Sequence, residues 1–270
     1  MNTNGKIMSW MVDAYENVVK HSAPGVFTGK PVEFGGSLAR TEATGYGVNL
    51  AAVQALEKLG KDVKGATYAI QGFGNVGYHT GYYAHQSGAK VVTVSTVDVA
   101  IYNENGLDME ALFKEFQEKG FITNKAGYGK EITNAELLAL DMDVLAPCAL
   151  ENQLTSENAG KVRAKIVVEG ANGPTTPEAD VILHQNGVLV VPDILANCGG
   201  VVVSYFEWVQ NLQGYYWEFD EVQEKEIVVL RRAFRDIWNL AQEYDVDLRT
   251  ASYMMSIRRV EKAMKLRGWY

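Results

Sequence analysis

The 270-residue sequence has few cysteines, few histidines and no long hydrophobic run. Cys148 and Cys198 stand far apart and without metal-type spacing, which indicates two reduced thiols in a cytoplasmic protein and not a disulfide framework. No apolar run approaches the roughly 18 residues that span a bilayer. The N-terminus lacks the basic-then-apolar layout of a signal peptide. These absences argue against a secreted or membrane-inserted protein.

Positive charge is also in the minority. The chain has 25 Lys and Arg against 33 Asp and Glu, a net charge of −8, which argues against nucleic acid or an anionic membrane as the main partner. The apolar share of 47% and charged share of 21% are ordinary for a globular protein. We find no internal repeat or low-complexity segment, so the composition favours an ordinary globular fold.

Short β-branched strands alternate with helices through the middle of the chain. The predicted strands cover 66–71, 90–95, 143–149, 165–171 and 188–193, and the predicted helices between them cover 75–87, 107–120 and 176–187. This alternation predicts an α/β fold: a doubly wound, Rossmann-type parallel sheet with flanking helices.

Helices are also expected at both ends of the chain. One amphipathic helix begins it, 21–36 reads as loop with room for a short strand, and 44–60 is a helix with Thr44 as its candidate cap. Two long amphipathic helices near 218–243 and 249–267 should cover the sheet. Residues 1–270 then make a single domain with a C-terminal helical cover.

A glycine-rich segment, GFGNVG, directly follows the predicted strand ATYAIQ and begins a helix. The three-glycine spacing alone is weak evidence in a chain with 26 glycines. Its place between strand and helix favours dinucleotide binding over a structural turn, because a pyrophosphate can bind the N–H groups at a helix N-terminus. Gly72 would allow the turn, Gly74 the approach of the phosphate, and Gly77 the packing of helix on strand. The candidate binding loop is Gly72, Phe73, Gly74, Asn75, Val76 and Gly77.

The acid expected about 20 residues beyond such a loop is missing from its usual place. The second strand ends in Ser95 and Thr96, and Asp98 follows two residues later. A hydroxyl can serve the 2′-hydroxyl of NAD or the 2′-phosphate of NADP. No Lys or Arg lies in the following turn to neutralise a phosphate, so the sequence slightly favours NAD and leaves both coenzymes open.

Five segments together carry a family resemblance. In order along the chain, TGKPVEFGGSLARTEATGYGV, GFGNVG, EGANGPTTPEAD, PDILANCGGVVVSYFEWVQN and AMKLRGWY resemble the C-terminal, coenzyme-binding domain of a bacterial NAD(P)-dependent glutamate dehydrogenase. The resemblance implies oxidative deamination of L-glutamate to 2-oxoglutarate and ammonium by a homohexamer. A related leucine, phenylalanine or valine dehydrogenase and a non-catalytic dinucleotide-binding module remain alternatives.

The resemblance also implies roles for individual residues. Positions near the nicotinamide, its ribose and the coenzyme backbone are Arg40, Thr44, Asn75, Ala149, Asn172 and Asn197. Val201 and Ser204 match the wall against the substrate side chain, with Ser204 donating to the distal carboxylate of glutamate. Each has a plainer reading: a surface ion pair for Arg40, turn residues for the asparagines, and a hydroxyl bonded back to its own helix for Ser204.

The groups that would complete the chemistry are not found. The family carries its catalytic lysine in a glycine-rich segment and its catalytic aspartate on a separate N-terminal domain, and no Gly-Gly-Gly-Lys-Gly-Gly segment occurs here. We therefore assign no catalytic residue and no metal ligand. We expect a domain without its catalytic partner domain, which binds a dinucleotide weakly, oxidises no glutamate alone, and is a monomer or small oligomer.

Overall fold

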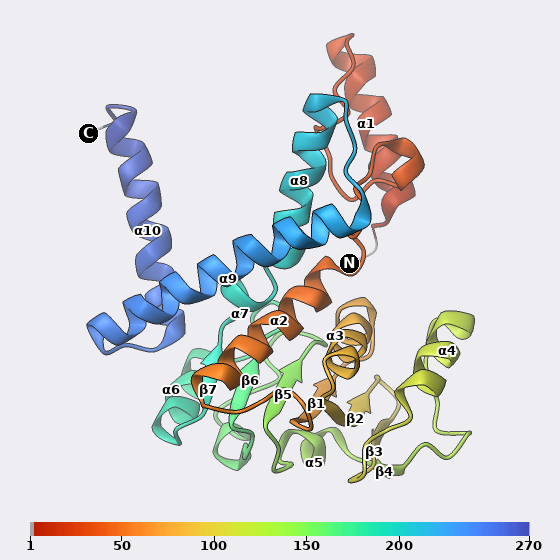
Figure 1. Cartoon of the computed structure of the whole chain (residues 1–270), viewed down its shortest axis with the longest axis vertical. Helices are drawn as coiled ribbons and strands as arrows, with labels where there is room; N and C mark the ends of the chain where they lie inside the picture. The colour runs from red at the N-terminus through yellow and green to blue at the C-terminus, as the bar shows by residue number, and fades with distance from the viewer. Residues whose placement is uncertain (1–2, 270) are drawn as a thin grey trace.

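Residues 3–269, which the computed structural model describes, form a central sheet with helices on both faces (Figure 1). The seven-stranded sheet has the order β4-β3-β2-β1-β5-β6-β7. Its strands are β1 (Thr67–Gln71), β2 (Lys90–Ser95), β3 (Ala100–Tyr102), β4 (Lys130–Ile132), β5 (Val144–Pro147), β6 (Ile166–Val168) and β7 (Leu189–Val191). Each predicted strand is present, and the doubly wound α/β fold is confirmed.

The sheet is nevertheless mixed, and not parallel throughout. Strands β1, β2, β5, β6 and β7 pair in parallel, whereas β3 and β4 pair antiparallel at one edge. The sequence did not reveal these two strands because each is only three residues long, too short for a recognisable alternation of apolar and polar residues.

The strands bury both of their faces, as parallel strands covered by helices do. On β1, Tyr68 and Ile70 join the larger core under α2, α3 and α9, while Ala69 between them joins the core under α5 and α6. This alternation follows from the two-residue period of a strand.

Ten α-helices are defined among the described residues. They are α1 (Gly5–Val19), α2 (Ala43–Lys58), α3 (Asn75–Gln86), α4 (Met109–Lys119), α5 (Asn134–Leu138), α6 (Pro177–Gln185), α7 (Asp193–Ala196), α8 (Gly199–Gln213), α9 (Phe219–Tyr244) and α10 (Leu248–Leu266).

Two expectations about the segments before the sheet were wrong. Segment 21–36 contains a 3₁₀ turn, η1 (Val32–Phe34), and no strand; a second 3₁₀ turn, η2 (Ala159–Lys161), lies between β5 and β6. Thr44 is not the cap of α2, because the helix begins at Ala43 and Glu42 occupies the cap position.

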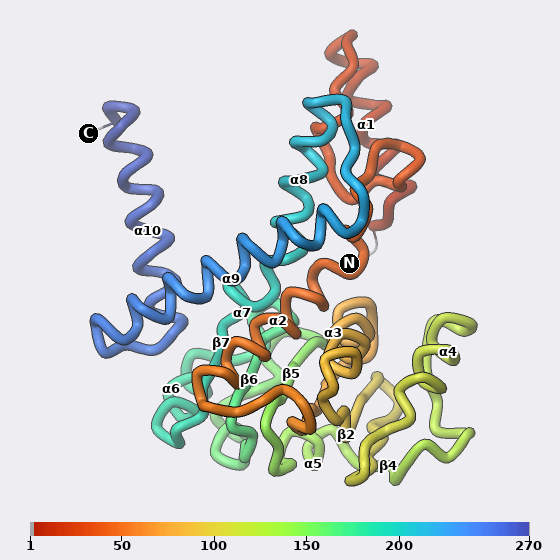
Figure 2. The backbone as a smooth tube through the Cα atoms, in the orientation of Figure 1, coloured from red at the N-terminus to blue at the C-terminus, as the bar shows by residue number. Residues whose placement is uncertain are grey.

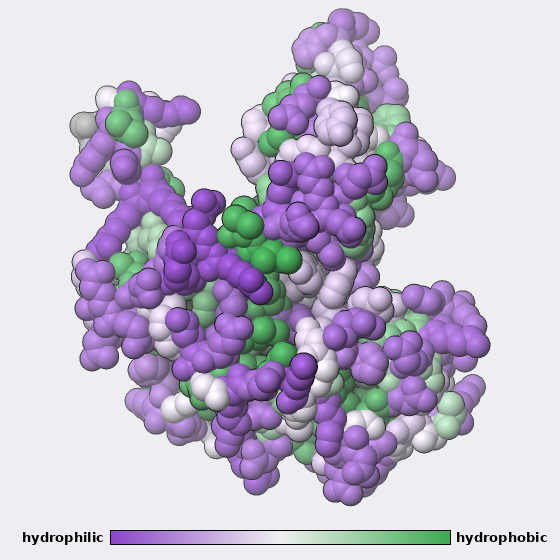
Figure 3. Space-filling model, in the orientation of Figure 1, coloured by the Kyte–Doolittle hydropathy of each residue, from purple (hydrophilic) through white to green (hydrophobic). Residues whose placement is uncertain are grey.

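The helical cover differs from the simple one that we expected. The long helix α9 crosses α2, whereas α10 and the pair α1 and α8 project as two arms (Figures 1 and 2). In the space-filling view, apolar side chains gather in a strip at the centre of this face between the arms, and polar ones dominate elsewhere (Figure 3).

No helix in the described range is long and apolar enough to cross a membrane. Both cysteines are free.

Candidate functional site at the carboxyl edge of the sheet

Four of the parallel strands end beside predicted site residues: Gly72 follows β1, Ser95 ends β2, and Ala149 and Asn172 come shortly after β5 and β6. Strand β1 pairs with β2 on one side and with β5 on the other, so the strand order, and not the strand direction, reverses beside β1. Ligands of doubly wound sheets bind at the carboxyl ends of the strands beside such a switch point. The glycine loop follows β1 at this position.

The glycine loop is closely packed at both ends and open in the middle. Gly72 has a φ of +89°, and a Cβ added there would lie 2.8 Å from Ala149, so glycine is required for both conformation and space. A Cβ on Gly77 would overlap the carbonyl oxygen of Gly72. Gly74, the N-cap of α3, has no atom within 4 Å of its added Cβ. The loop therefore has the shape that an approaching phosphate needs: room above free N–H groups at a helix N-terminus.

Phe73 is the loop residue whose side chain turns away from this opening. It is only 3% exposed, and its ring packs among those of Tyr78, Phe113 and Phe116. Val76 is half-buried and packs against the same core. Phe73 can thus face a ligand only with its backbone.

Ser95 and Thr96, at the end of β2, are both engaged with backbone. The buried Ser95 Oγ accepts the N–H of Gly72 at 3.1 Å and so supports the loop from below. Thr96 Oγ1 accepts the N–H groups of Asp98 and Val99, each at 3.3 Å, in a tight turn. The Asp98 carboxylate is exposed at this turn. The negative charge there favours a 2′-hydroxyl over a 2′-phosphate.

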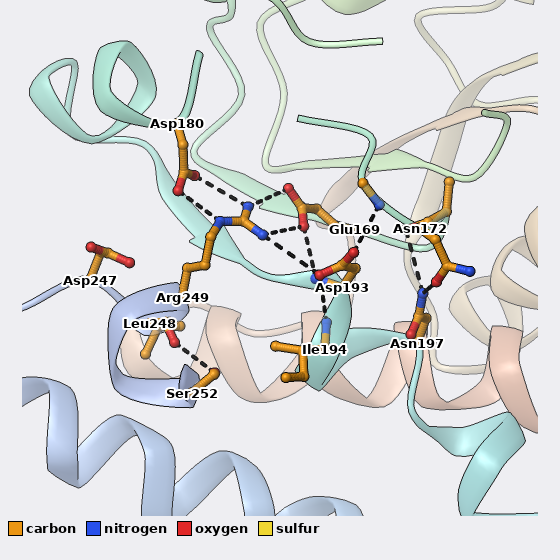
Figure 4. Close-up of polar contacts among 12 residues, drawn as sticks. Glu169, Asn172, Asp180, Asp193, Ile194, Asn197, Asp247, Leu248, Arg249 and Ser252 are labelled. Carbon is orange, nitrogen blue, oxygen red and sulfur yellow. Dashed lines mark hydrogen bonds and ion pairs between the residues drawn. The ribbon is translucent and has the colours of Figure 1, made fainter. Parts of the chain in front are cut away.

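Asn172 and Asn197 come together from two different connections (Figure 4). Asn172 follows β6, and Asn197 is the C-cap of α7. The Asn197 Nδ2 donates to Asn172 Oδ1 at 2.6 Å and reaches the carbonyl oxygens of Gly170 and Ala171 at 3.4 Å. The two predicted residues therefore form one polar pair, with the Asn172 side chain exposed.

Arg40, Thr44 and Ser204 form a third group, where α2 meets the start of α8. The Arg40 Nε donates to Ser204 Oγ at 2.8 Å, so Ser204 bonds to a neighbouring cation and not to its own helix. Thr44 Oγ1 fits against Gly200, where a Cβ would collide with it. Burial lowers the pKa of the Arg40 guanidinium, against the opposite effect of the nearby Glu207 and Glu226 carboxylates.

Val201 and Asn75 complete the set of predicted residues. Val201 is 66% exposed on α8, one turn before Ser204. The Asn75 Nδ2 donates to the Thr41 carbonyl at 2.9 Å, which ties the glycine loop to the chain entering α2. Its amide is therefore partly committed to the protein.

Glu226, on α9, is a residue of this region that sequence reasoning missed. It is fully buried, and neither carboxyl oxygen has a hydrogen-bond partner among the described residues. Burial and the Glu42 carboxylate raise the pKa of Glu226 to about 8, with Arg40 opposing them. The signal was present: Glu226 stands four residues after Val222 and four before Leu230, within the buried stripe of α9.

Comparison with known proteins places this geometry in a family. The model of the Glutamate/Leucine/Phenylalanine/Valine dehydrogenase family matches residues 35–268. The chain is 52% identical over 275 residues to the NAD-specific glutamate dehydrogenase of Clostridioides difficile, and 51% over 271 residues to the glutamate dehydrogenase of Thermotoga maritima. Each alignment includes all of this chain and 65% of the relative, so the chain spans less than two thirds of the length of these relatives.

Solved structures agree with this assignment. The glutamate dehydrogenase of Peptoniphilus asaccharolyticus superposes with a TM-score of 0.86 at 43% identity, over all of this chain and 64% of that one. The hetero-hexameric enzyme of Thermus thermophilus gives 0.92 at 33% identity, over 100% and 64% of the two chains. From its sequence and its fold, the chain belongs to the glutamate/leucine/phenylalanine/valine dehydrogenase family.

Proposed function

We propose that this chain is the coenzyme-binding part of an NAD-dependent glutamate dehydrogenase. The observation that carries the proposal is the shape of the glycine loop, in which Gly72 and Gly77 leave no space and Gly74 leaves the helix N-terminus open. This opening fits a pyrophosphate. Relatives from Clostridioides difficile and Staphylococcus aureus, 52% and 46% identical, are named NAD-specific, and the exposed Asp98 supports the same preference.

The remaining predicted residues have proposed places around the coenzyme. The N–H groups of the loop from Phe73 to Gly77 would hold the pyrophosphate, with Ser95 supporting the loop. Thr96 and Asp98 would face the adenosine ribose. The nicotinamide half would lie among Ala149, Asn172, Asn197, Arg40 and Thr44. When bound, NAD supplies the hydride acceptor for oxidation of an amino acid.

For the substrate we propose glutamate, on the strength of Ser204. Its oxygen already accepts a hydrogen bond from Arg40, which leaves the hydroxyl proton free to donate to a carboxylate. The Arg40 charge beside it also favours an anionic side chain. A leucine, phenylalanine or valine dehydrogenase has no use for this pair, because its substrate side chain is apolar.

Amino-acid oxidation further requires a residue that moves protons at the α-amino centre. The glycine-rich lysine segment of the family does not occur in this sequence, so we propose that a separate domain provides it. The 270-residue chain alone should show no glutamate oxidation. Turnover by this chain would overturn that part of the proposal.

Coenzyme binding is testable by titrating the 270-residue chain with NADH and with NADPH and following coenzyme fluorescence. We expect saturable binding with NADH the tighter ligand. The variants Gly74→Ala and Gly160→Ala form a matched pair, because neither added Cβ would have an atom within 4 Å. Only Gly74→Ala should weaken binding, since its methyl group occupies the path of the phosphate. No binding of either coenzyme at millimolar concentration would contradict the proposal.

A further inference from the structure

Arg249, in the first turn of α10, binds carboxylates from three other segments (Figure 4). Its guanidinium donates to the two oxygens of Glu169 at 2.6 and 3.1 Å and to those of Asp180 at 2.7 and 3.3 Å. Asp193 Oδ1 lies 3.6 Å from Nη1. A cation is unfavourable at a helix N-terminus, so α10 itself gains little from this placement. The three carboxylates around Arg249 explain better why an arginine stands at this position.

Glu169 and Asp193 extend these contacts toward the coenzyme edge. Glu169 is fully buried, and its Oε2 also accepts the backbone N–H of Asp193 at 2.8 Å. Asp193 Oδ2 in turn accepts the N–H of Gly173 at 2.8 Å. The hydrogen bonds therefore run from Arg249 through two carboxylates to the peptide between Asn172 and Gly173.

The same path also reaches the second asparagine. Asp193 is the first residue of α7, and Asn197 is the C-cap of that four-residue helix, with its N–H bonded to the Asp193 carbonyl at 3.0 Å. Asn197 then donates to Asn172 at 2.6 Å. Both members of the asparagine pair are thus fixed to Asp193, one through its side chain and one through its backbone.

Helix α10 is joined to the rest of the molecule mainly near Arg249. Its buried residues in the described part of the chain are Leu248, Ala251 and Ser252, all in the first two turns. The remainder projects as an arm (Figures 1 and 2). The contacts that position α10 therefore lie close to the carboxylates that Arg249 binds.

We propose that Arg249 is a positioning residue for coenzyme binding, which holds Asn172 and Asn197 in place through Glu169 and Asp193. The placement of α10 then sets the geometry of the nicotinamide half of the site. This inference rests on the proposed coenzyme function, because the asparagine pair is assigned to the coenzyme only there.

The test compares Arg249→Gln with Arg259→Gln in the 270-residue chain. Arg259 is exposed on the same helix, so both variants lose one positive charge. We expect Arg249→Gln to raise the Kd for NADH about tenfold and to leave the Kd for ADP, which lacks the nicotinamide half, unchanged. Arg259→Gln should change neither. An unchanged Kd for NADH, or equal weakening of NADH and ADP, would overturn the positioning role.

A second measurement needs no coenzyme. Amide hydrogen exchange should become faster in 170–175 and 193–198 but not in 72–77 in the Arg249→Gln chain. Because this variant leaves the buried Glu169 without its cation, the double variant Glu169→Gln with Arg249→Gln is measured as well. Unchanged exchange in both variants would overturn the inference even if NADH binds. If the parent chain binds neither NADH nor ADP while exchange responds as expected, the proposed coenzyme function fails and the positioning network stands.

Discussion

The glycine loop and the start of α8 both border α2, yet they are stabilised in different ways. The loop can pack closely only because two of its residues have no side chain: a Cβ on Gly72 or Gly77 would collide with backbone atoms. The buried side chains that hydrogen-bond the loop, the hydroxyls of Ser95 and Thr80, are both neutral. This half of the site is defined by shape.

The region around α8 is defined instead by buried charge. We call the buried Lys30, Glu207 and Glu226, together with the half-buried Arg40, the buried-charge cluster. Lys30 Nζ donates to Glu207 at 2.6 Å with both side chains inaccessible to solvent, and it also donates to Asn211 at 2.9 Å. Glu226 has no such partner among the described residues. One carboxylate of the cluster is thus matched by a cation, and the other is held in its neutral form by burial.

The comparison teaches that the two halves should respond to different perturbations. Substitutions in the loop should act through steric overlap at any pH. Substitutions in the buried-charge cluster should act through desolvation, with effects that depend on pH or on which partner is removed. Phosphate binding needs a fixed shape, whereas the α8 region places charge near the proposed site for an anionic side chain.

The largest effect is expected from Gly77→Ala. Its Cβ would overlap the Gly72 carbonyl, and since both are backbone positions neither can yield cheaply, so the loss of stability should exceed about 4 kcal/mol. Gly74→Ala should cost only about 1 kcal/mol, because the space is open and alanine is merely a poorer N-cap. Urea unfolding measures both. Equal stabilities for the two variants would contradict a loop fixed by shape.

Lys30→Met should have the next largest effect. It leaves the Glu207 carboxylate buried without a cation, which typically costs about 3–5 kcal/mol. Lys265→Met is the control, since Lys265 pairs with Glu261 on the exposed face of α10, where solvent screens the charges and the pair adds little stability. The free energies of unfolding should differ accordingly. Similar small losses would mean that the buried pair is not a determinant of stability.

The Glu226→Gln variant tests the pH dependence. Because the folded pKa is raised to about 8, the folded chain keeps a proton that the unfolded chain releases near pH 4.5. Stability should therefore fall as pH rises between these values, by at most about 1.4 kcal/mol per pH unit. Glutamine removes this loss, so the variant should gain on the parent from pH 5 to pH 9. Parallel stability curves would show that the carboxyl group is not held neutral.

The sequence predicted the parts of the molecule that are local. The five parallel strands were found because each is a short apolar run between turns, and the glycine loop because strand, loop and helix are contiguous from 66 to 87. The strands β3 and β4 were missed since three residues carry too little pattern. The prediction of Thr44 as the cap of α2 was wrong, because the helix starts at Ala43 and Glu42, its N-cap residue, makes no side-chain cap hydrogen bond.

What the sequence could not predict depends on contacts between distant positions. Arg249 lies in α10 and Glu169 directly follows β6, and nothing in the sequence near either residue indicates the other. The pair of Lys30 and Glu207 is similar. Glu226 is the exception, because a charged residue within the apolar stripe of α9 is visible in the sequence as a conflict with burial.

The smallest effect concerns the coenzyme preference at the exposed end of β2. Asp98→Asn should strengthen NADPH binding about two- to fivefold, because it removes a carboxylate beside the 2′-phosphate, and the effect is limited by solvent screening. NADH binding should change little. Glu104→Gln, at a second exposed acid beyond β3, is the control and should alter neither coenzyme. The gain for NADPH should shrink at high salt. An equal gain for both coenzymes would mean that Asp98 acts on the shape of the turn, as the glycines do on the loop, and not through its charge.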